Sequence, residues 1–329
     1  MHDWPWPLQM SAFFVALFFL LVIITVAMLI ILRRYKIRRE QKKKLFQDTI
    51  DTFLNNCLFD ETFNLKEEAQ SFKGQHLKSK LQKKIAVKEI LVYNENLKGE
   101  SSITLKNIFR ALELDAFILN SLQEGRWYDK ARAIYALSEL HVKESRQVAL
   151  YLNDRHETVR AQAIYFFIKT AENNPLTFFT KLKKELTLWE LIQIEDSLKF
   201  VYEGPNPNFS MWLNHELSTV LIFSIRMIQQ FNQFEYIPAI IPFLDHPNEQ
   251  VRKQAVSSLR KLNYESLLEK VVPKFSMETR LVKKEIIKAV ESLGDLQMLH
   301  DLKPALTQNE EWQTQLMFLG AEKRMHPNL

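Results

Sequence analysis

The chain has 329 residues and a formal net charge of +5. Eight of the 44 Lys and Arg residues lie within residues 33–44, and only Asp3 and Glu40 of the 39 Asp and Glu residues precede residue 45, so the rest of the chain is close to neutral. A neutral body lacks the basic surface that nucleic-acid binding requires. One cysteine excludes an internal disulfide framework and fits a reducing compartment, and six glycines indicate a helical protein without a phosphate-binding loop.

The first element in the chain is an apolar run over residues 10–32, which contains no charged residue. A helix of this length spans about 34 Å, enough for a hydrocarbon core of about 30 Å. We therefore predict a transmembrane helix. The alternative, a cleaved signal peptide, requires a basic segment before a shorter apolar core and a small-residue cleavage site, and none of these is present.

Basic residues follow the apolar run and are absent before it. They are Arg33, Arg34, Lys36, Arg38, Arg39, Lys42, Lys43 and Lys44. Because positive flanks stay in the cytoplasm, we expect a single-pass protein of a cell inner (cytoplasmic) membrane, with its C-terminal domain in the cytoplasm. The N-terminus, with Trp4 and Trp6 as an interfacial anchor, is expected outside. The basic segment is either a topology signal alone or also a cluster that attracts anionic lipid headgroups.

Residues 45–114 are expected to form a helical connector. Apolar residues at three-to-four spacing predict a helix that packs in the body or lies on the membrane, and its polar positions, which are not Lys or Arg, favour packing. This stripe consists of Leu45, Phe46, Ile50, Phe53, Leu54, Cys57 and Leu58. Residues 60–85 are rich in charge and indicate an exposed helix or a loose connector. Ser102, which precedes Leu105 and Ile108, is expected to cap a helix start.

From Asp115 onward, apolar residues recur with a period of 30 or 31. One column consists of Ala133, Ala163, Ile194, Ser224, Ala255, Ile286 and Met317, and the column four residues later consists of Leu137, Phe167, Leu198, Ile228, Leu259, Val290 and Ala321. One helical turn before the first column, four repeats carry a valine: Val159, Val220, Val251 and Val282. Each repeat therefore presents one apolar face that only a stacked neighbour covers.

Two segments carry a resemblance to a known family. Residues 151–160 (YLNDRHETVR) and 243–252 (FLDHPNEQVR) resemble the loop and second-helix start of HEAT repeats, in which two apolar residues, an Asp and a Val-Arg pair recur. Asp154 occupies the family's Asp position, His246 replaces it in the other copy, and Lys130 and Lys283 stand where Arg is usual. The resemblance covers about residues 115–321 and is strongest in these two copies.

The resemblance implies an all-α fold: an α-solenoid of about six or seven HEAT-like hairpins over residues 115–329, behind the transmembrane helix (1–32), the basic segment (33–44) and the connector (45–114). It also implies that Asp154, Arg160 and Arg252 join adjacent hairpins and are structural. The register is interrupted between residues 203 and 214, which is either a plain break or a binding loop. Candidate partner-contact residues are Trp127, Tyr128, Pro205, Asn206 and Trp212.

No catalytic motif is present: the chain lacks a phosphate loop, a His-Glu-x-x-His motif, a Cys-x-x-Cys pair and a nucleophile elbow. We therefore expect a non-enzymatic scaffold without cofactor or metal, whose solenoid binds a membrane-associated protein. An accessory role to bacterial envelope machinery, such as a membrane glycosyltransferase making an exopolysaccharide, is one version suggested by the resemblance. The alternative is a lyase-type HEAT-repeat enzyme, by analogy of fold alone.

Overall fold

The computed structural model describes residues 5–60, 64–142, 144–306 and 312–326, and every regular element within them is helical. The all-α prediction is confirmed. The chain divides into two compact units, Met1–Gly125 and Arg126–Leu329, which we call unit 1 and unit 2 and describe separately. Trp4 lies outside the described residues, and Trp6 is exposed.

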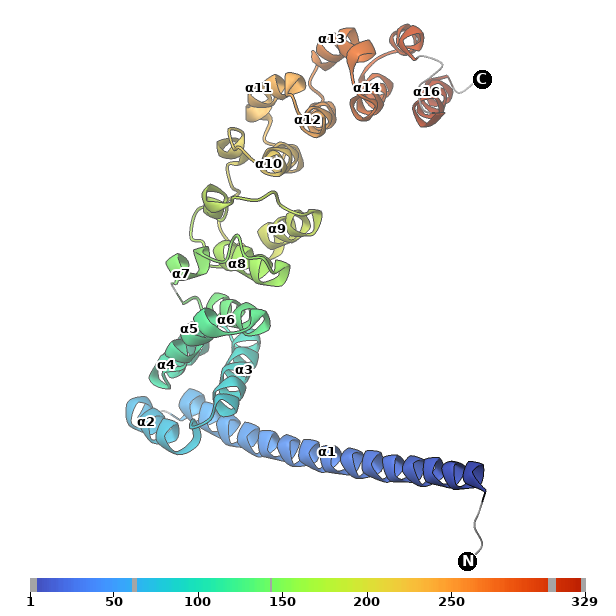
Figure 1. The fold of residues 1–329 in the computed structure, drawn as a ribbon. Coiled ribbons are helices and arrows are strands. Elements are labelled where there is room, and N and C mark those ends of the chain that lie inside the picture. Colours follow the sequence, from blue (N-terminus) through green and yellow to red (C-terminus); the bar gives the residue numbers. More distant parts are fainter. Residues whose placement is uncertain (1–4, 61–63, 143, 307–311, 327–329) are drawn as a thin grey trace, which may run out of the picture. The chain divides into compact units, whose positions relative to one another are not determined.

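Helix α1 (Trp6–Phe59) is unbroken across the predicted boundaries after residues 32 and 44 (Figure 1). The basic segment continues the helix because Arg, Lys, Glu and Gln are good helix formers and neither Gly nor Pro interrupts them. Lys43 also lies 2.6 Å from Glu40, one turn earlier. In the described chain, α1 is the one helix long and apolar enough to cross a membrane, and none of its most apolar window is buried within the protein.

The end of α1 belongs to the core of unit 1. Phe46, Ile50, Phe53 and Leu54 are buried where α1 packs on α3 (Lys80–Asn96) and α4 (Glu100–Ala111). Phe53 also stacks on Phe72 of α2 (Leu65–His76), with ring centroids 4.3 Å apart. The packing interpretation of this stripe is confirmed, except that Leu45 is exposed. Helix α5 (Leu114–Glu124) completes the unit.

The predicted cap at Ser102 is wrong. Helix α4 begins two residues earlier, at Glu100, after Gly99 with φ of 70°. This positive φ favours glycine and lets the chain turn into the helix before Ser102 is reached. The Ser102 hydroxyl instead donates to Asn94 Oδ1, at 2.8 Å.

Unit 2 is a stack of helical repeats with an α-solenoid-like arrangement. Its long helices lie in one row, and α10, α12, α14 and α16 can be followed side by side in Figure 1. This long-helix row consists of α6 (Trp127–Glu139), α8 (Glu157–Lys169), α9 (Leu188–Phe200), α10 (Ser218–Gln230), α12 (Glu249–Lys261), α14 (Arg280–Leu293) and α16 (Trp312–Met325). Both predicted apolar columns are buried in it, apart from the half-buried Phe167 and Met317. The repeat register is therefore confirmed.

The other arm of each repeat is shorter than the predicted hairpins suggest. These elements are α7 (Ser145–Ala149), η1 (Thr177–Lys181), η2 (Phe209–Trp212), η3 (Phe234–Tyr236), α11 (Ile237–Ile240), η4 (Ile241–Asp245), α13 (Leu267–Val271), η5 (Val272–Met277), α15 (Leu296–Asp301) and η6 (Lys303–Ala305). Proline stands in the first turn of α11, η4, η5 and η6. Because proline lacks an N–H group and clashes with the preceding turn, it prevents one continuous α-helix in these arms.

Ion pairs connect neighbouring repeats. Arg160 on α8 pairs with Glu190 on α9 through Nε and through Nη2, at 2.8 Å from Oε2. Arg252 on α12 pairs with Glu278, which precedes α14, at 2.9 Å. Asp154 accepts a hydrogen bond from the backbone N–H of His156 at 2.8 Å. Arg160 and Arg252 thus join adjacent repeats as expected, whereas this Asp154 bond lies within one loop and does not join two repeats.

The junction between α9 and α10 is polar. Glu195 on α9 lies 3.0 Å from Arg226 Nη2 and accepts from Gln230 at 2.7 Å, both on α10, and it also pairs with Lys199. Burial disfavours the charged form of Glu195, but the hydrogen bonds from Lys199 and Gln230 and the nearby cations outweigh it, so the pKa of Glu195 lies below its usual value.

Candidate functional site

Helices α6 and α9 begin with exposed aromatic and apolar side chains, and the half-buried His156 immediately precedes α8. We call this the aromatic edge and define it as Trp127, Tyr128, His156, Leu188 and Trp189. Trp127 stacks on His156, with centroids 3.9 Å apart and planes at 10°, and meets Tyr128 edge-to-face at 5.6 Å. Trp189 and Leu188, on α9, are 72% and 70% exposed.

Three residues of this edge were missed by sequence reasoning. Trp127 and Tyr128 are candidates from the sequence, and His156, Leu188 and Trp189 are not. The signal was present, because Leu188 and Trp189 begin α9 as Trp127 and Tyr128 begin α6, two repeats earlier. Reading the repeat register for exposed positions as well as for buried ones would have found them.

Trp212, by contrast, belongs to the core. It is 7% exposed, and its ring lies edge-on to Phe179, with centroids 5.2 Å apart. Phe179 in turn contacts Phe223 of α10 at 5.9 Å. Burial leaves Trp212 almost no surface for a partner, so these contacts favour packing over recognition.

The loop between α9 and η2 is fixed at both ends. The Tyr202 hydroxyl donates to the backbone carbonyl of Asn173 at 2.8 Å, and the carbonyl of Pro207 accepts from Gln233 at 2.9 Å. Pro205 and Asn206 lie exposed at its tip. At Gly204, an added Cβ would lie 2.2 Å from the Tyr202 hydroxyl, so a side chain there would displace Tyr202.

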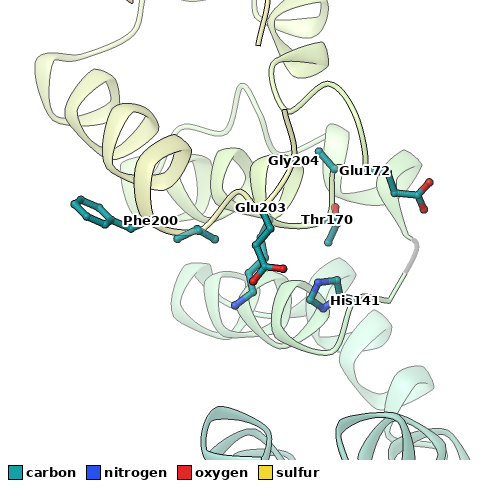
Figure 2. Close-up of a pocket in the computed structure, with 9 residues that line it drawn as sticks. His141, Thr170, Glu172, Phe200, Glu203 and Gly204 are labelled. Carbon is teal, nitrogen blue, oxygen red and sulfur yellow. The ribbon is translucent and has the colours of Figure 1, made fainter. Parts of the chain in front are cut away.

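A hollow of about 570 Å³ opens at the C-terminal ends of α6, α8 and α9. Figure 2 shows His141 and Glu203 directed toward the same space, whereas the Glu172 carboxylate points away. Lys169, on its wall, is held 2.6 Å from Glu139. No group of three His, Cys, Asp or Glu side chains that suits a metal ion occurs among the described residues. The hollow thus offers polar surface, with His141 and Glu203 directed into it.

The basic segment on α1 is solvent-exposed. All eight of its cationic side chains are exposed except Lys43, which is half-buried. Their positions follow both faces of the helix, because consecutive residues on a helix are about 100° apart. The arrangement suits a diffuse anionic surface better than one bound anion.

The chain matches no protein-family model and no curated protein.

Proposed function

We propose that this chain is a membrane-anchored, non-enzymatic scaffold whose solenoid of short HEAT-like repeats binds a protein partner at the cytoplasmic face. The observation that carries the proposal is an exposed apolar α1 joined to a chain whose repeats are tied together by Arg160 and Arg252. Stacked helical repeats create extended surfaces that suit protein recognition. The HEAT assignment rests on the two segments 151–160 and 243–252.

Anchoring gives such a scaffold an energetic advantage. Confinement to the membrane raises the effective concentration of any partner held in the same membrane, so the solenoid requires only modest intrinsic affinity. We therefore propose a partner that is itself associated with the membrane. In a bacterium, one example is a glycosyltransferase that makes an exopolysaccharide.

In this proposal the basic segment both sets the orientation in the membrane and binds lipid headgroups. With α1 perpendicular to the bilayer, Arg33, Arg34 and Lys36 lie within the headgroup layer, which is about 5 to 8 Å deep on each side. Lys44 lies about 18 Å beyond Leu32, since a helix rises about 1.5 Å per residue. The first cations therefore contact anionic lipid headgroups, each contributing on the order of 1 kcal/mol.

Exchange of the apolar run tests the scaffold. A photo-reactive residue at several exposed positions of unit 2 reports partner contact in intact membranes. Replacing residues 10–32 by an unrelated single-pass helix of the same orientation should keep the cross-linked partner, because the run contains no Gly-x-x-x-Gly pair and no charge. Deleting residues 1–32 should lose it. Loss with the unrelated helix, at parental membrane level, shows that α1 itself makes the contact and overturns the proposal.

A further inference from the structure

We propose that unit 2 contains a hinge between α9 and α10, and that a polar latch between these two helices holds the hinge closed. The polar latch consists of Glu195 and Lys199 on α9 with Arg226 and Gln230 on α10. The hinge divides the solenoid into a first arm, α6 to α9, and a second arm, α10 to α16. It goes beyond the scaffold function, because it changes the shape of the solenoid whatever the partner is.

Glu195 occupies a position that is apolar in every other repeat. This position follows the first apolar column by one residue. In the other repeats it holds side chains that are at most 2% exposed, namely Ile134, Ile164, Ile225, Val256, Ile287 and Phe318. The Glu195 side chain is 17% exposed and carries a carboxylate. The other repeats therefore gain stability here by burying an apolar side chain, and the α9 repeat does not.

Helix packing is also sparsest at this junction. Helix α6 packs directly on α8, α8 on α9, α10 on α12, α12 on α14, and α14 on α16. Helices α9 and α10 make few close contacts with each other, and the short element η2 packs on α10 instead. Within the described chain, the long-helix row is thus interrupted at one junction, which coincides with the break in the repeat register between residues 203 and 214.

Polar side chains, rather than closely packed backbones, connect α9 with α10. The Glu195 carboxylate lies 3.0 Å from Arg226 Nη2 and 2.6 Å from Lys199 Nζ, and it accepts from the Gln230 amide at 2.7 Å. The side chains of Arg226 and Lys199 are 31% and 34% exposed, so water reaches the latch. Ion pairs that water reaches contribute little to stability. The latch therefore opens more readily than a junction of buried apolar side chains.

Other contacts across the junction form the pivot. Phe179 of η1 lies edge-on to Trp212 of η2, with centroids 5.2 Å apart, and contacts Phe223 of α10 at 5.9 Å. Glu185, which precedes α9, accepts from the Thr219 N–H at 2.9 Å. Thr219 lies in the first turn of α10 and Gln230 is its last residue, so this tie and the latch are about 16 Å apart along the helix. The pivot thus stays joined when the latch opens.

The chain crosses the hinge through the exposed residues 203–206. Before them, the Tyr202 hydroxyl donates to the Asn173 carbonyl in the first arm at 2.8 Å. After them, the Pro207 carbonyl accepts from Gln233 in the second arm at 2.9 Å. Each end of the loop therefore moves with its own arm, and the residues between absorb the change in backbone angles, as hinge segments do.

Distances between spin labels test the hinge in the full chain, in phosphatidylcholine nanodiscs. Cys57→Ala removes the native thiol, and cysteines are introduced in pairs at exposed positions that occupy the same place in their repeats. The hinge pair, Phe200→Cys with Lys261→Cys, spans α9, α10 and α12. The control pair, Lys261→Cys with Lys323→Cys, spans α12, α14 and α16, and it crosses only directly packed junctions. Double electron–electron resonance records the distance distribution of each pair.

One variant opens the latch and a matched variant breaks an ion pair elsewhere. Glu195→Gln removes the ion pairs of the latch and should raise the open-to-closed ratio about tenfold, which broadens the distribution of the hinge pair. Arg252→Gln removes the ion pair with Glu278 between the α12 and α14 repeats. It should leave the control pair unchanged, because α12 and α14 pack directly. Circular dichroism should show that both variants remain folded.

Two results overturn the proposal. A hinge pair whose distribution Glu195→Gln leaves unchanged shows that the α9–α10 junction does not open at the latch. Equal broadening of the hinge pair by Glu195→Gln and of the control pair by Arg252→Gln shows that loss of any ion pair loosens the stack, so that no hinge is localised here. In both cases the scaffold function stands, because the cross-linking of a partner tests it separately.

Discussion

At the scale of single residues, the pair Arg160 and Glu190 connects two repeats where a charge is least tolerated. The Glu190 side chain is 2% exposed and the Arg160 side chain 11%. Glu190 also closes the capping box of α9 with Thr187. Removing the cation would leave a buried charge without compensation, so Arg160 contributes more to stability than a cation in a surface ion pair would.

Arg160→Met should therefore destabilise the protein by about 3 to 5 kcal/mol, because it leaves Glu190 buried without its cation. Urea unfolding at pH 7 measures the loss. Arg155→Met, an exposed position in the same repeat, is the control and should change stability by less than about 0.5 kcal/mol. The double variant Arg160→Met with Glu190→Met should regain much of the loss, and equal midpoints for all variants would contradict a scaffold role for the pair.

Glu195 makes stability depend on pH. Its pKa is lowered from the usual 4.5 by the hydrogen bonds and cations that outweigh burial. A lowered carboxyl pKa contributes stability above the unfolded value, and that contribution is lost as pH falls through the folded value. Glu195→Gln should cost about 1 to 2 kcal/mol at pH 7, and the difference from the parent should shrink as pH falls below the usual value of 4.5 and through the lower folded value. Asp196→Asn removes an exposed carboxylate on the same helix and serves as the control; a deficit that persists at acid pH would refute this account.

At the scale of elements, the long helices are defined by buried small or apolar columns. Ala163 of α8 and Ala255 of α12 are both fully buried in the same column. There is no room for a larger ring where consecutive repeats stack, since protein interiors are close-packed.

Ala163→Trp and Ala255→Trp should each destabilise the stack by about 1 to 3 kcal/mol through overpacking. The urea midpoint reports the change. Gln250→Trp places the same ring on the exposed start of α12 and should leave the midpoint near that of the parent. If the buried and exposed substitutions behaved alike, the assigned repeat register would be wrong.

At the scale of the whole molecule, orientation in the membrane is the property that sequence predicts most directly. A reporter that is active only in the periplasm, fused after Leu329, should be silent, because eight cations follow the apolar run and none precedes it. Replacing Arg33, Arg34, Lys36, Arg38 and Arg39 by serine should raise its signal. An active reporter on the unaltered chain would reverse the predicted topology.

The repeat architecture could be predicted because its apolar residues recur at a fixed period. The columns through Ala163 and Phe167 recur every 30 or 31 residues, so many weak matches add up. Local features without a repeat were harder: Gly99 starts α4 through its positive φ, which competes with the cap at Ser102. Proline also breaks the shorter arms of several repeats, such as η5. The change from apolar to basic residues after residue 32 suggested a boundary, but α1 continues through it.

The candidate surface was only partly predictable, because exposure depends on how neighbours pack. Trp127 and Trp212 are both tryptophans in helical elements, yet one is half exposed and the other is buried against Phe179. No single-residue property separates them. Their positions in the repeat do, since Trp127 begins a long helix and Trp212 ends the short element η2.

If the apolar run spans the membrane as proposed, the unbroken α1 fixes the direction in which unit 1 faces around the helix axis. Phe46 and Ile50, in the core of unit 1, share one rigid helix with the apolar run. One residue inserted within 33–44 would swing unit 1 by about 100° around that axis, whereas seven residues, nearly two turns, would restore its heading to within about 20° while moving it about 10 Å from the bilayer. A partner fixed in the same membrane would therefore meet a given face of unit 1 only at insertions close to whole turns.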